Sequence, residues 1–207
     1  MKNIDFDSAW KKESQVFRSP FLKSLIENKA QQFSPKAKNF LEVGSGPYSV
    51  LEEINLGANR LEAWDVSNVA IEKAQLRQGS VTYRRRDIFE SENEGGFDMI
   101  IDGHLLHYFT HPYNQEIYLK RIKNLLNTDG LFILETMVSS KIDHLTQNGK
   151  VIKKVFSPLE FENLVKKFFL IKYLVYPFGL KFDLSQLIDQ DEAPDVVQCI
   201  LSKEAQI

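Results

Sequence analysis

Short apolar runs alternate with segments of helical periodicity from about residue 38 onward. The apolar runs predict strands at residues 39–44, 60–65, 80–85, 97–102 and 130–138. Segments with apolar residues three or four positions apart predict helices at residues 49–56, 67–78 and 113–127. This alternation is typical of a parallel sheet with helices on both faces.

The last third of the chain departs from this alternation. A helix predicted at residues 157–168, with Ser157 at its start, is followed by two strands at 169–178 and 195–203. No helix is predicted between these strands, so they form an antiparallel pair most simply. The sequence therefore predicts an α/β fold, a doubly wound and mostly parallel seven-stranded sheet of Rossmann-like type that ends in an antiparallel hairpin.

The chain is predicted to divide into two parts. Residues 1–37 read as an N-terminal helical cap of two amphipathic helices, and residues 38–207 read as one structural unit. A long polar segment at 139–156 follows the fifth strand and is interpreted as a lid or substrate loop.

The composition indicates a globular protein of the cytoplasm. The 207 residues are 43% hydrophobic, which is enough for a sizeable core. A formal net charge of −2 gives no electrostatic attraction to nucleic acid or to an anionic membrane surface, so neither is expected as a partner. The single cysteine, Cys199, fits a reducing compartment. The charged start is unlike a signal peptide, and no stretch is apolar enough to span a bilayer. Nothing in the sequence predicts the oligomeric state.

The turn Gly44–Ser45–Gly46 directly follows the first predicted strand. In open parallel sheets, ligands bind beyond the carboxyl ends of the strands, which is where this turn lies. The third glycine of the dinucleotide fingerprint is replaced by Ser49, and no P-loop lysine follows the turn. A carboxylate, Glu42, precedes the turn and disfavours a phosphate beside it. The pattern therefore favours a ligand that carries an ammonium group.

Acidic residues also close the next three strands. Asp65 ends the second strand, where a carboxylate can accept hydrogen bonds from ribose hydroxyls. Asp87 follows the third strand, and its apolar neighbour Ile88 suits the face of an adenine ring. Asp102 and Gly103 end the fourth strand at the same edge of the sheet. The sequence thus predicts a nucleoside site without a pyrophosphate.

These residues resemble the class I S-adenosylmethionine-dependent methyltransferases. The resemblance rests on "LEVGSG", "AWDVS", "RDIFE", "FDMIIDGHLLHY" and "LLNTDGLFILE", and it is greatest for the small-molecule branch with its thiopurine and tellurite-resistance type enzymes. It implies methyl transfer from S-adenosylmethionine to a small-molecule acceptor, with S-adenosylhomocysteine as the product. A departure is Tyr48, which stands where the family often has a third glycine.

The resemblance also implies which residues hold the cofactor. Glu42, Gly44, Ser45 and Gly46 would lie against its amino acid part, Asp65 would bind its ribose, Val66 and Ile88 would sandwich the adenine, Asp87 would hydrogen-bond the adenine, and the backbone of Asp102 and Gly103 would line the methionine segment.

Two residues are candidates for chemistry on the acceptor. His104 directly follows the fourth strand and is a candidate base or orienting group, or a histidine satisfied by its neighbours. Glu135 is interpreted as ending the fifth strand and is a candidate contact for an amine or hydroxyl acceptor, or a strand cap. His107 reads as structural. His111 completes a helical spacing that would suit a metal, but Pro112 starts a new helix there, so no metal is expected.

Two charged runs, Arg84–Arg86 and Lys153–Lys154, read as solvated. Several aromatic residues are candidates for a rim around the acceptor pocket, or for packing: Trp10, Phe17, Phe21, Tyr176, Phe178 and Phe182.

Two other functions remain open from the sequence. One is an NAD(P)-dependent oxidoreductase, which Ser49, Glu42 and the terminal hairpin disfavour. The other is a non-catalytic module that binds S-adenosylmethionine. It remains open because the cofactor motifs indicate binding of the cofactor and not catalysis.

Overall fold

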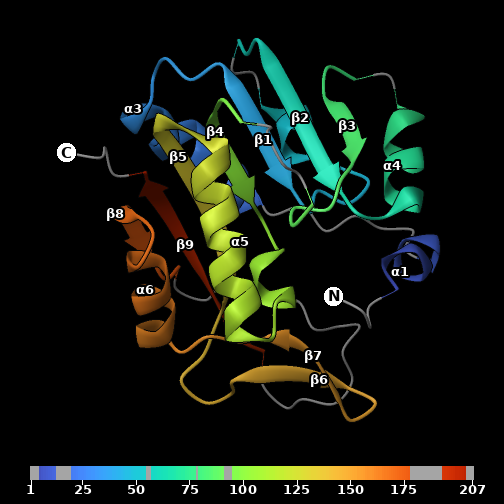
Figure 1. Cartoon of the computed structure of the whole chain (residues 1–207), viewed down its shortest axis with the longest axis vertical. Coiled ribbons are helices and arrows are strands. Elements are labelled where there is room, and N and C mark those ends of the chain that lie inside the picture. The colour runs from blue at the N-terminus through green and yellow to red at the C-terminus, as the bar shows by residue number, and fades with distance from the viewer. Residues whose placement is uncertain are drawn as a thin grey trace.

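A seven-stranded sheet with helices on both faces forms the body of the protein (Figure 1). The computed structural model describes residues 5–12, 20–54, 57–77, 79–90, 95–177 and 193–203. The strands of the sheet are β1 (Asn39–Val43), β2 (Arg60–Asp65), β3 (Thr82–Arg85), β4 (Phe97–Asp102), β5 (Leu126–Val138), β8 (Leu170–Val175) and β9 (Asp195–Ser202).

The strand order is β3-β2-β1-β4-β5-β9-β8. Strands β1 to β5 pair in parallel, whereas β9 runs antiparallel to both β5 and β8. The predicted fold class, with its terminal antiparallel pair, is confirmed. The order also places β9 directly beside β5, between it and β8.

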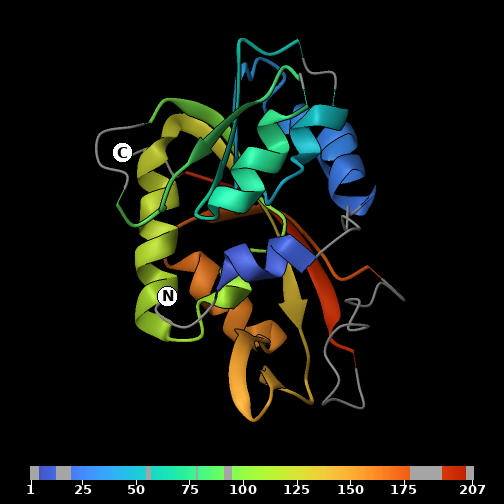
Figure 2. The ribbon, with the colours of Figure 1, turned by 90° about the vertical axis from the view of Figure 1, so that its right-hand side faces the viewer.

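Helices cover the two faces of the sheet, as Figures 1 and 2 show from two sides. The helical elements are α1 (Phe6–Lys12), α2 (Pro20–Leu25), the π-helical η1 (Ile26–Ala30), α3 (Gln31–Phe33), the 3₁₀ turn η2 (Val50–Glu53), α4 (Asn68–Gln75), the 3₁₀ turn η3 (Leu106–Tyr108), α5 (Pro112–Leu125) and α6 (Pro158–Lys166).

The core consists of two buried clusters, one on each face of the sheet. Leu41 of β1 packs in the cluster formed with α5 and α6, and its neighbour Phe40 packs in the cluster formed with α2, η1 and α4. Successive residues of a strand point to opposite faces, so a strand that is buried on both faces must be apolar throughout. This is why β1, β4 and the second half of β5 are mostly apolar, and why the acids buried in them need hydrogen-bond partners.

Side-chain caps fix two of the predicted helix starts. The hydroxyl of Ser67 accepts a hydrogen bond from Ala70 N at 3.1 Å, which caps α4. Ser157 and Glu160 form a capping box at the start of α6, and Pro158 takes the first helical position.

Two segments differ from the sequence-based expectation. Residues 49–56, predicted as a helix, form only the short turn η2, because the backbone is already extended at Ile54. The polar segment at 139–156 contains an antiparallel pair, β6 (His144–Gln147) and β7 (Lys150–Lys154). Its two-residue turn has positive φ at Asn148 (51°) and Gly149 (71°).

None of the helices within the described residues combines the length and the apolar character that a membrane span requires.

Candidate active site

The glycine turn holds the ends of β1 and β2 together. Gly44 and Gly46 both have positive φ, 65° and 59°, which a side chain would strain. Gly44 N donates to Trp64 O at 2.8 Å, and Gly46 N donates to Asp65 Oδ2 at 2.8 Å. Gly44 is exposed at the edge of the sheet where the site was predicted, whereas Gly46 is buried.

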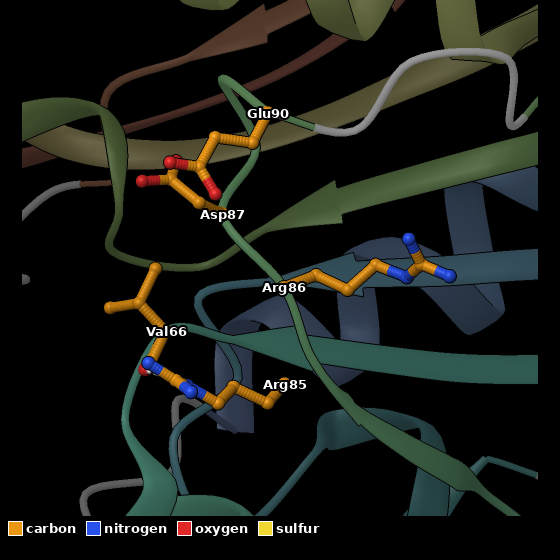
Figure 3. Close-up of a pocket in the computed structure, with 5 residues that line it drawn as sticks. All are labelled: Val66, Arg85, Arg86, Asp87 and Glu90. Atoms are coloured by element: carbon orange, nitrogen blue, oxygen red, sulfur yellow. Dashed lines mark hydrogen bonds between the residues drawn. The ribbon is translucent and has the colours of Figure 1, made fainter.

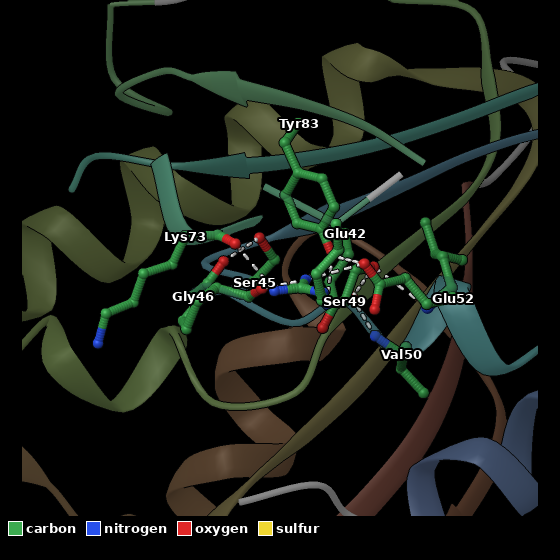
Figure 4. A network of polar contacts seen from close by, with 11 residues as sticks. Glu42, Ser45, Gly46, Ser49, Val50, Glu52, Lys73 and Tyr83 are labelled. Carbon is green, nitrogen blue, oxygen red and sulfur yellow. Dashed lines mark hydrogen bonds and ion pairs between the residues drawn. The ribbon is translucent and has the colours of Figure 1, made fainter. Parts of the chain in front are cut away.

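Glu42 organises the backbone that follows this turn (Figure 4). Its Oε2 accepts hydrogen bonds from the hydroxyl of Ser49 and from Val50 N, the latter at 2.7 Å. Burial raises the pKa of Glu42 to about 8 in spite of these two donors, and the nearby carboxylates of Asp102 and Glu52 act in the same direction. Glu42 is therefore largely protonated at neutral pH in the ligand-free protein.

Asp65 plays a similar role at the end of β2. Besides Gly46 N, it accepts a hydrogen bond from Ser67 N at 2.8 Å, and it is buried. Burial raises the pKa of Asp65, while the backbone donors oppose that shift. Val66 N is a third backbone donor to this carboxylate, which has about four acceptor positions, so capacity is left for one ribose hydroxyl.

Tyr48, the departure from the family pattern, stacks on an arginine. Its ring lies 3.9 Å from the guanidinium carbon of Arg77. Arg77 also donates to Pro47 O and, at 2.9 Å, to Glu52 Oε1. Through Arg77, which follows α4, these contacts connect Tyr48, Pro47 and Glu52 to the C-terminal end of that helix.

A cavity of about 450 Å³ opens beyond the ends of β2 and β3 (Figure 3). It is lined by Val66, Arg85, Arg86, Asp87 and Glu90. Val66 and Asp87 were predicted for the adenine, whereas the two arginines were expected to be solvated and Glu90 was given no role. Ile88, the other residue predicted for the adenine, packs into the core with 4% of its surface exposed.

The N-terminal helix α1 lies against the glycine turn. Asp7 accepts hydrogen bonds from the hydroxyl of Ser67 at 2.5 Å and from Val69 N at 3.3 Å, and Lys73 donates to Trp10 O at 2.5 Å. An ideal Cβ on Gly46 would lie 2.6 Å from Cζ2 of Trp10. The structure therefore places Trp10, one of the predicted rim residues, directly over the turn.

The other residues predicted for the aromatic rim give no evidence for or against that role. Phe21 and Tyr176 are 47% and 39% exposed. Phe17, Phe178 and Phe182 lie outside the described residues.

Asp102 holds the loop that follows β4. Its buried carboxylate accepts hydrogen bonds from Leu105 N (2.5 Å), Leu106 N (3.0 Å) and the hydroxyl of Tyr118 (2.7 Å). Burial raises the pKa of Asp102 to about 6. The sequence-based prediction was that the carboxylates at the strand ends face the ligand in a row. In the structure, Glu42, Asp65 and Asp102 instead accept hydrogen bonds from the backbone of the loops that follow their strands. The backbone of Gly103, next to Asp102, packs near Leu22.

His104 and Glu135 come together beside this loop. His104 Nε2 lies 3.4 Å from Glu135 Oε1, and their side chains are 27% and 2% exposed. Glu135 lies within β5 and not at its end, so it is not a strand cap. Burial lowers the pKa of His104 to about 3, and the ammonium of Lys153 adds to the effect. His104 is therefore a neutral imidazole at physiological pH.

His107 and Lys153 complete the surroundings of this pair. His107 is fully buried, its Nδ1 lies 3.5 Å from Thr136 Oγ1, and its ring packs 4.9 Å from that of Tyr108. Lys153, expected to be solvated, instead places its ammonium 4.8 Å from the Tyr108 ring centroid. Strand β7 thus contributes a positive charge near the two histidines.

His111 caps α5, with its Nδ1 accepting from Tyr113 N at 3.2 Å. Over the part of the chain that is described, no three His, Cys, Asp or Glu side chains gather as metal ligands would.

The family model for nodulation protein S (NodS) matches residues 1–160, which is more than half of the chain. The chain belongs to the NodS family. A comparison with curated protein sequences finds no match.

Solved structures similar to this NodS-family chain share its fold at low sequence identity. An S-adenosylmethionine-dependent methyltransferase from Methanosarcina mazei is 14% identical with a TM-score of 0.71, over 92% of this chain and 100% of that one. The 1,6-didemethyltoxoflavin-N1-methyltransferase of Burkholderia thailandensis, solved with 1,6-didemethyltoxoflavin and S-adenosylhomocysteine, is 18% identical with a TM-score of 0.67, over 97% of this chain and 83% of that one.

The N-methyltransferase NodS of Bradyrhizobium japonicum, solved with S-adenosylhomocysteine, is 14% identical with a TM-score of 0.64, over 95% of this chain and 97% of that one. Identities this low establish the fold alone. Family and fold agree on the class I S-adenosylmethionine-dependent methyltransferases.

Proposed function

We propose that this protein transfers a methyl group from S-adenosylmethionine to an amine nitrogen of a small-molecule acceptor. Membership of the NodS family and the activities of two structural neighbours, both N-methyltransferases, support the choice of nitrogen. The observation that carries the proposal is the contact of His104 with the buried Glu135, directly after the glycine that follows β4.

The residues at the sheet edge fit the proposed cofactor. Val66 and Asp87 line a cavity of a size that suits an adenine, and Asp65 lies between this cavity and the glycine turn. Gly44 is exposed at the turn, whereas the indole of Trp10 covers Gly46, so a ligand that lies along the whole turn must displace the indole. When bound, S-adenosylmethionine supplies a methyl group on a sulfonium, which a nitrogen lone pair can displace.

His104 is proposed to orient the acceptor. The imidazole is 27% exposed and its two nitrogens are buried, so the part of the ring that a bound acceptor can contact consists of its carbon atoms. The acceptor nitrogen attacks as the neutral amine, becomes an ammonium as it gains its fourth bond, and loses its excess proton to solvent, because an imidazole with a pKa of about 3 is too weak a base to take it. Alignment and exclusion of water supply much of the remaining acceleration.

A methyl-transfer assay over matched acceptors tests the proposal. The purified protein is incubated with S-adenosylmethionine and a primary amine, a thiol or a phenol built on the same small scaffold, and S-adenosylhomocysteine release is measured. The proposal predicts that the amine reacts fastest. Faster reaction of the thiol would instead favour the thiopurine and tellurite-resistance branch.

Thermal unfolding with added ligand separates the two other functions. A ligand that binds only the folded state raises the melting temperature. S-adenosylhomocysteine is expected to raise it and NAD is not. Stabilisation by NAD alone would indicate an oxidoreductase, and cofactor binding without turnover of any acceptor would indicate a binding module.

A further inference from the structure

The segment that directly follows the glycine turn is held by Arg77, which lies after α4. The guanidinium of Arg77 donates to Pro47 O, the carbonyl next to Gly46, and its carbon lies 3.9 Å from the centroid of the Tyr48 ring. A guanidinium donates hydrogen bonds in its plane and stacks on a ring with its face. One side chain therefore fixes two successive residues of this segment.

A glutamate and a tyrosine extend these contacts to the next residue of the segment. Arg77 Nη2 forms an ion pair with Glu52 Oε1 at 2.9 Å, and the hydroxyl of Tyr83 donates to the same oxygen at 2.7 Å. The Tyr83 hydroxyl in turn accepts a hydrogen bond from Ser49 N at 2.7 Å (Figure 4). Burial and the hydrogen bond to Glu52 raise the pKa of Tyr83, so its hydroxyl keeps the proton that it donates. We call Tyr48, Glu52, Arg77 and Tyr83 the turn clamp.

The turn clamp connects the segment to several elements of the fold. Glu52 lies in η2, Arg77 follows α4, and Tyr83 lies in β3. The side chains of Arg77 and Glu52 are 30% and 18% exposed, so their ion pair is less screened by water than a fully exposed pair. The hydroxyl of Ser49 also donates to the buried Glu42. The segment is thereby held by Glu42 and by the turn clamp together.

The shape of the glycine turn depends on such contacts. Gly44 and Gly46 allow many backbone conformations, so the turn has little preference of its own. Gly46 N is held by Asp65, and the carbonyl of the next residue, Pro47, is held by Arg77. A loop that already has its bound shape loses less conformational entropy when a ligand arrives.

We propose that Arg77 is a positioning residue for the cofactor, which acts through the turn clamp by holding the glycine turn in the shape that receives the amino acid part of S-adenosylmethionine. This inference rests on the part of the proposed function that places the cofactor at the turn, and it does not depend on the acceptor. It assigns a role to Tyr48, at which the sequence departs from the family pattern.

Arg77→Met removes the guanidinium and keeps much of the apolar side chain. Calorimetric titration is expected to show about tenfold weaker binding of S-adenosylhomocysteine, the effect of losing one hydrogen bond to a charged group. The KM for S-adenosylmethionine is expected to rise by a similar factor, whereas kcat should stay unchanged, because the turn clamp does not touch the reacting atoms. Arg77→Lys keeps the charge but not the flat face, so its affinity is expected to lie between those of Arg77→Met and the wild type.

The matched control is Arg60→Met at the start of β2. Arg60 also pairs with a glutamate, Glu62, at 2.8 Å, and its guanidinium carbon lies 4.2 Å from the centroid of the Phe97 ring. It lies at the opposite end of the strand from Asp65. Arg60→Met is expected to lower stability in urea as Arg77→Met does, and to keep the affinity for S-adenosylhomocysteine. Equal losses of affinity in the two variants, or wild-type affinity in Arg77→Met, would overturn the proposal.

Amide hydrogen exchange gives a second readout, which needs neither turnover nor bound cofactor. Exchange at Gly46 N and Ser49 N is expected to become about tenfold faster in Arg77→Met and to stay unchanged in Arg60→Met. A wild-type protein that shows this response but does not bind S-adenosylhomocysteine would contradict the proposed function and not the hold of Arg77 on the turn. Unchanged exchange in Arg77→Met would contradict the positioning whatever the affinity. If Arg77→Met does not fold, Tyr83→Phe, which removes only a hydroxyl, takes its place with the same predicted directions.

Discussion

The indole of Trp10 lies against the backbone of Gly46, so that an ideal Cβ on this glycine would stand 2.6 Å from Cζ2 of the ring. This contact joins the first helix of the chain to the turn after β1. It leaves no room for a side chain on Gly46, whose φ of 59° already disfavours one.

Gly46→Ala is therefore expected to destabilise the protein by about 1–3 kcal/mol, the usual cost of a strained backbone position, and to weaken S-adenosylhomocysteine binding. Urea unfolding and calorimetric titration measure the two effects. Because part of the cost is the clash with the indole, Gly46→Ala should cost less in a Trp10→Ala background. Equal costs in both backgrounds would contradict the contact.

Asp65→Ala is expected to weaken binding of S-adenosylhomocysteine at least tenfold. It leaves Gly46 N and Ser67 N without their acceptor, at about 1–3 kcal/mol for each buried donor, and it removes the acceptor proposed for the ribose. The matched control is Asp98→Ala, since Asp98 also accepts two backbone hydrogen bonds, from Lys38 N and Asn39 N, at the start of β1. Asp98→Ala should lower stability only, and equal losses of binding in both variants would count against the site.

Glu42→Gln is expected to remove a pH dependence of stability. The pKa of Glu42 is about 8 in the folded protein against 4.5 for an ordinary glutamate, so the folded state binds a proton that the unfolded state has lost. Stability on this account falls as the pH rises from about 4.5 to about 8. Gln mimics the protonated form, because its carbonyl can accept from Ser49 and Val50 as Oε2 does.

Chemical unfolding at about pH 6.5 and about pH 8.5 measures this effect, because the lowered pKa of His104 and that of Asp102, about 6, lie below this range. The wild type is expected to lose roughly 1–2 kcal/mol between these values, and Glu42→Gln is expected to lose much less. The exposed Glu72 of α4 gives the control Glu72→Gln, which should behave as the wild type. Equal losses in all three proteins would show that Glu42 is ionised throughout.

His104→Ala is expected to lower kcat about 100-fold, the cost of a misplaced acceptor, because it removes a group proposed to orient the acceptor. Affinity for S-adenosylhomocysteine should change little, because the cavity beside Val66 and Asp87 lies at the ends of β2 and β3. Steady-state kinetics with saturating cofactor, together with calorimetry, separate the two quantities. A variant that loses cofactor affinity but keeps kcat would place His104 in the binding site instead.

Much of the fold and part of the site could be predicted from local patterns. Apolar runs and capping residues such as Ser67 and Ser157 act over a few positions, so the sequence shows them directly. The hairpin β6–β7 was missed although Asn148–Gly149 is a strong hairpin signal, because its flanking strands are short and polar.

Other parts of the site depend on tertiary contacts that a single sequence does not display. Gln198 meets Glu135 only because β9 lies beside β5, a register between residues 63 positions apart. Trp10 reaches Gly46 only because Asp7 and Lys73 fix α1 on α4. The carboxylates at the strand ends were located correctly, but the hydrogen bonds that they accept from their own loops were not foreseen.

The central claim is that S-adenosylmethionine binds over the glycine turn with its adenine in the cavity beside Val66. Calorimetric titration with S-adenosylhomocysteine tests this claim most directly, for the wild type, for Val66→Arg, which fills the cavity, and for Leu76→Arg, at a residue that is 84% exposed. The account predicts binding to the wild type and to Leu76→Arg, and loss of binding in Val66→Arg. No binding to the wild type, or equal affinity in all three proteins, would contradict it.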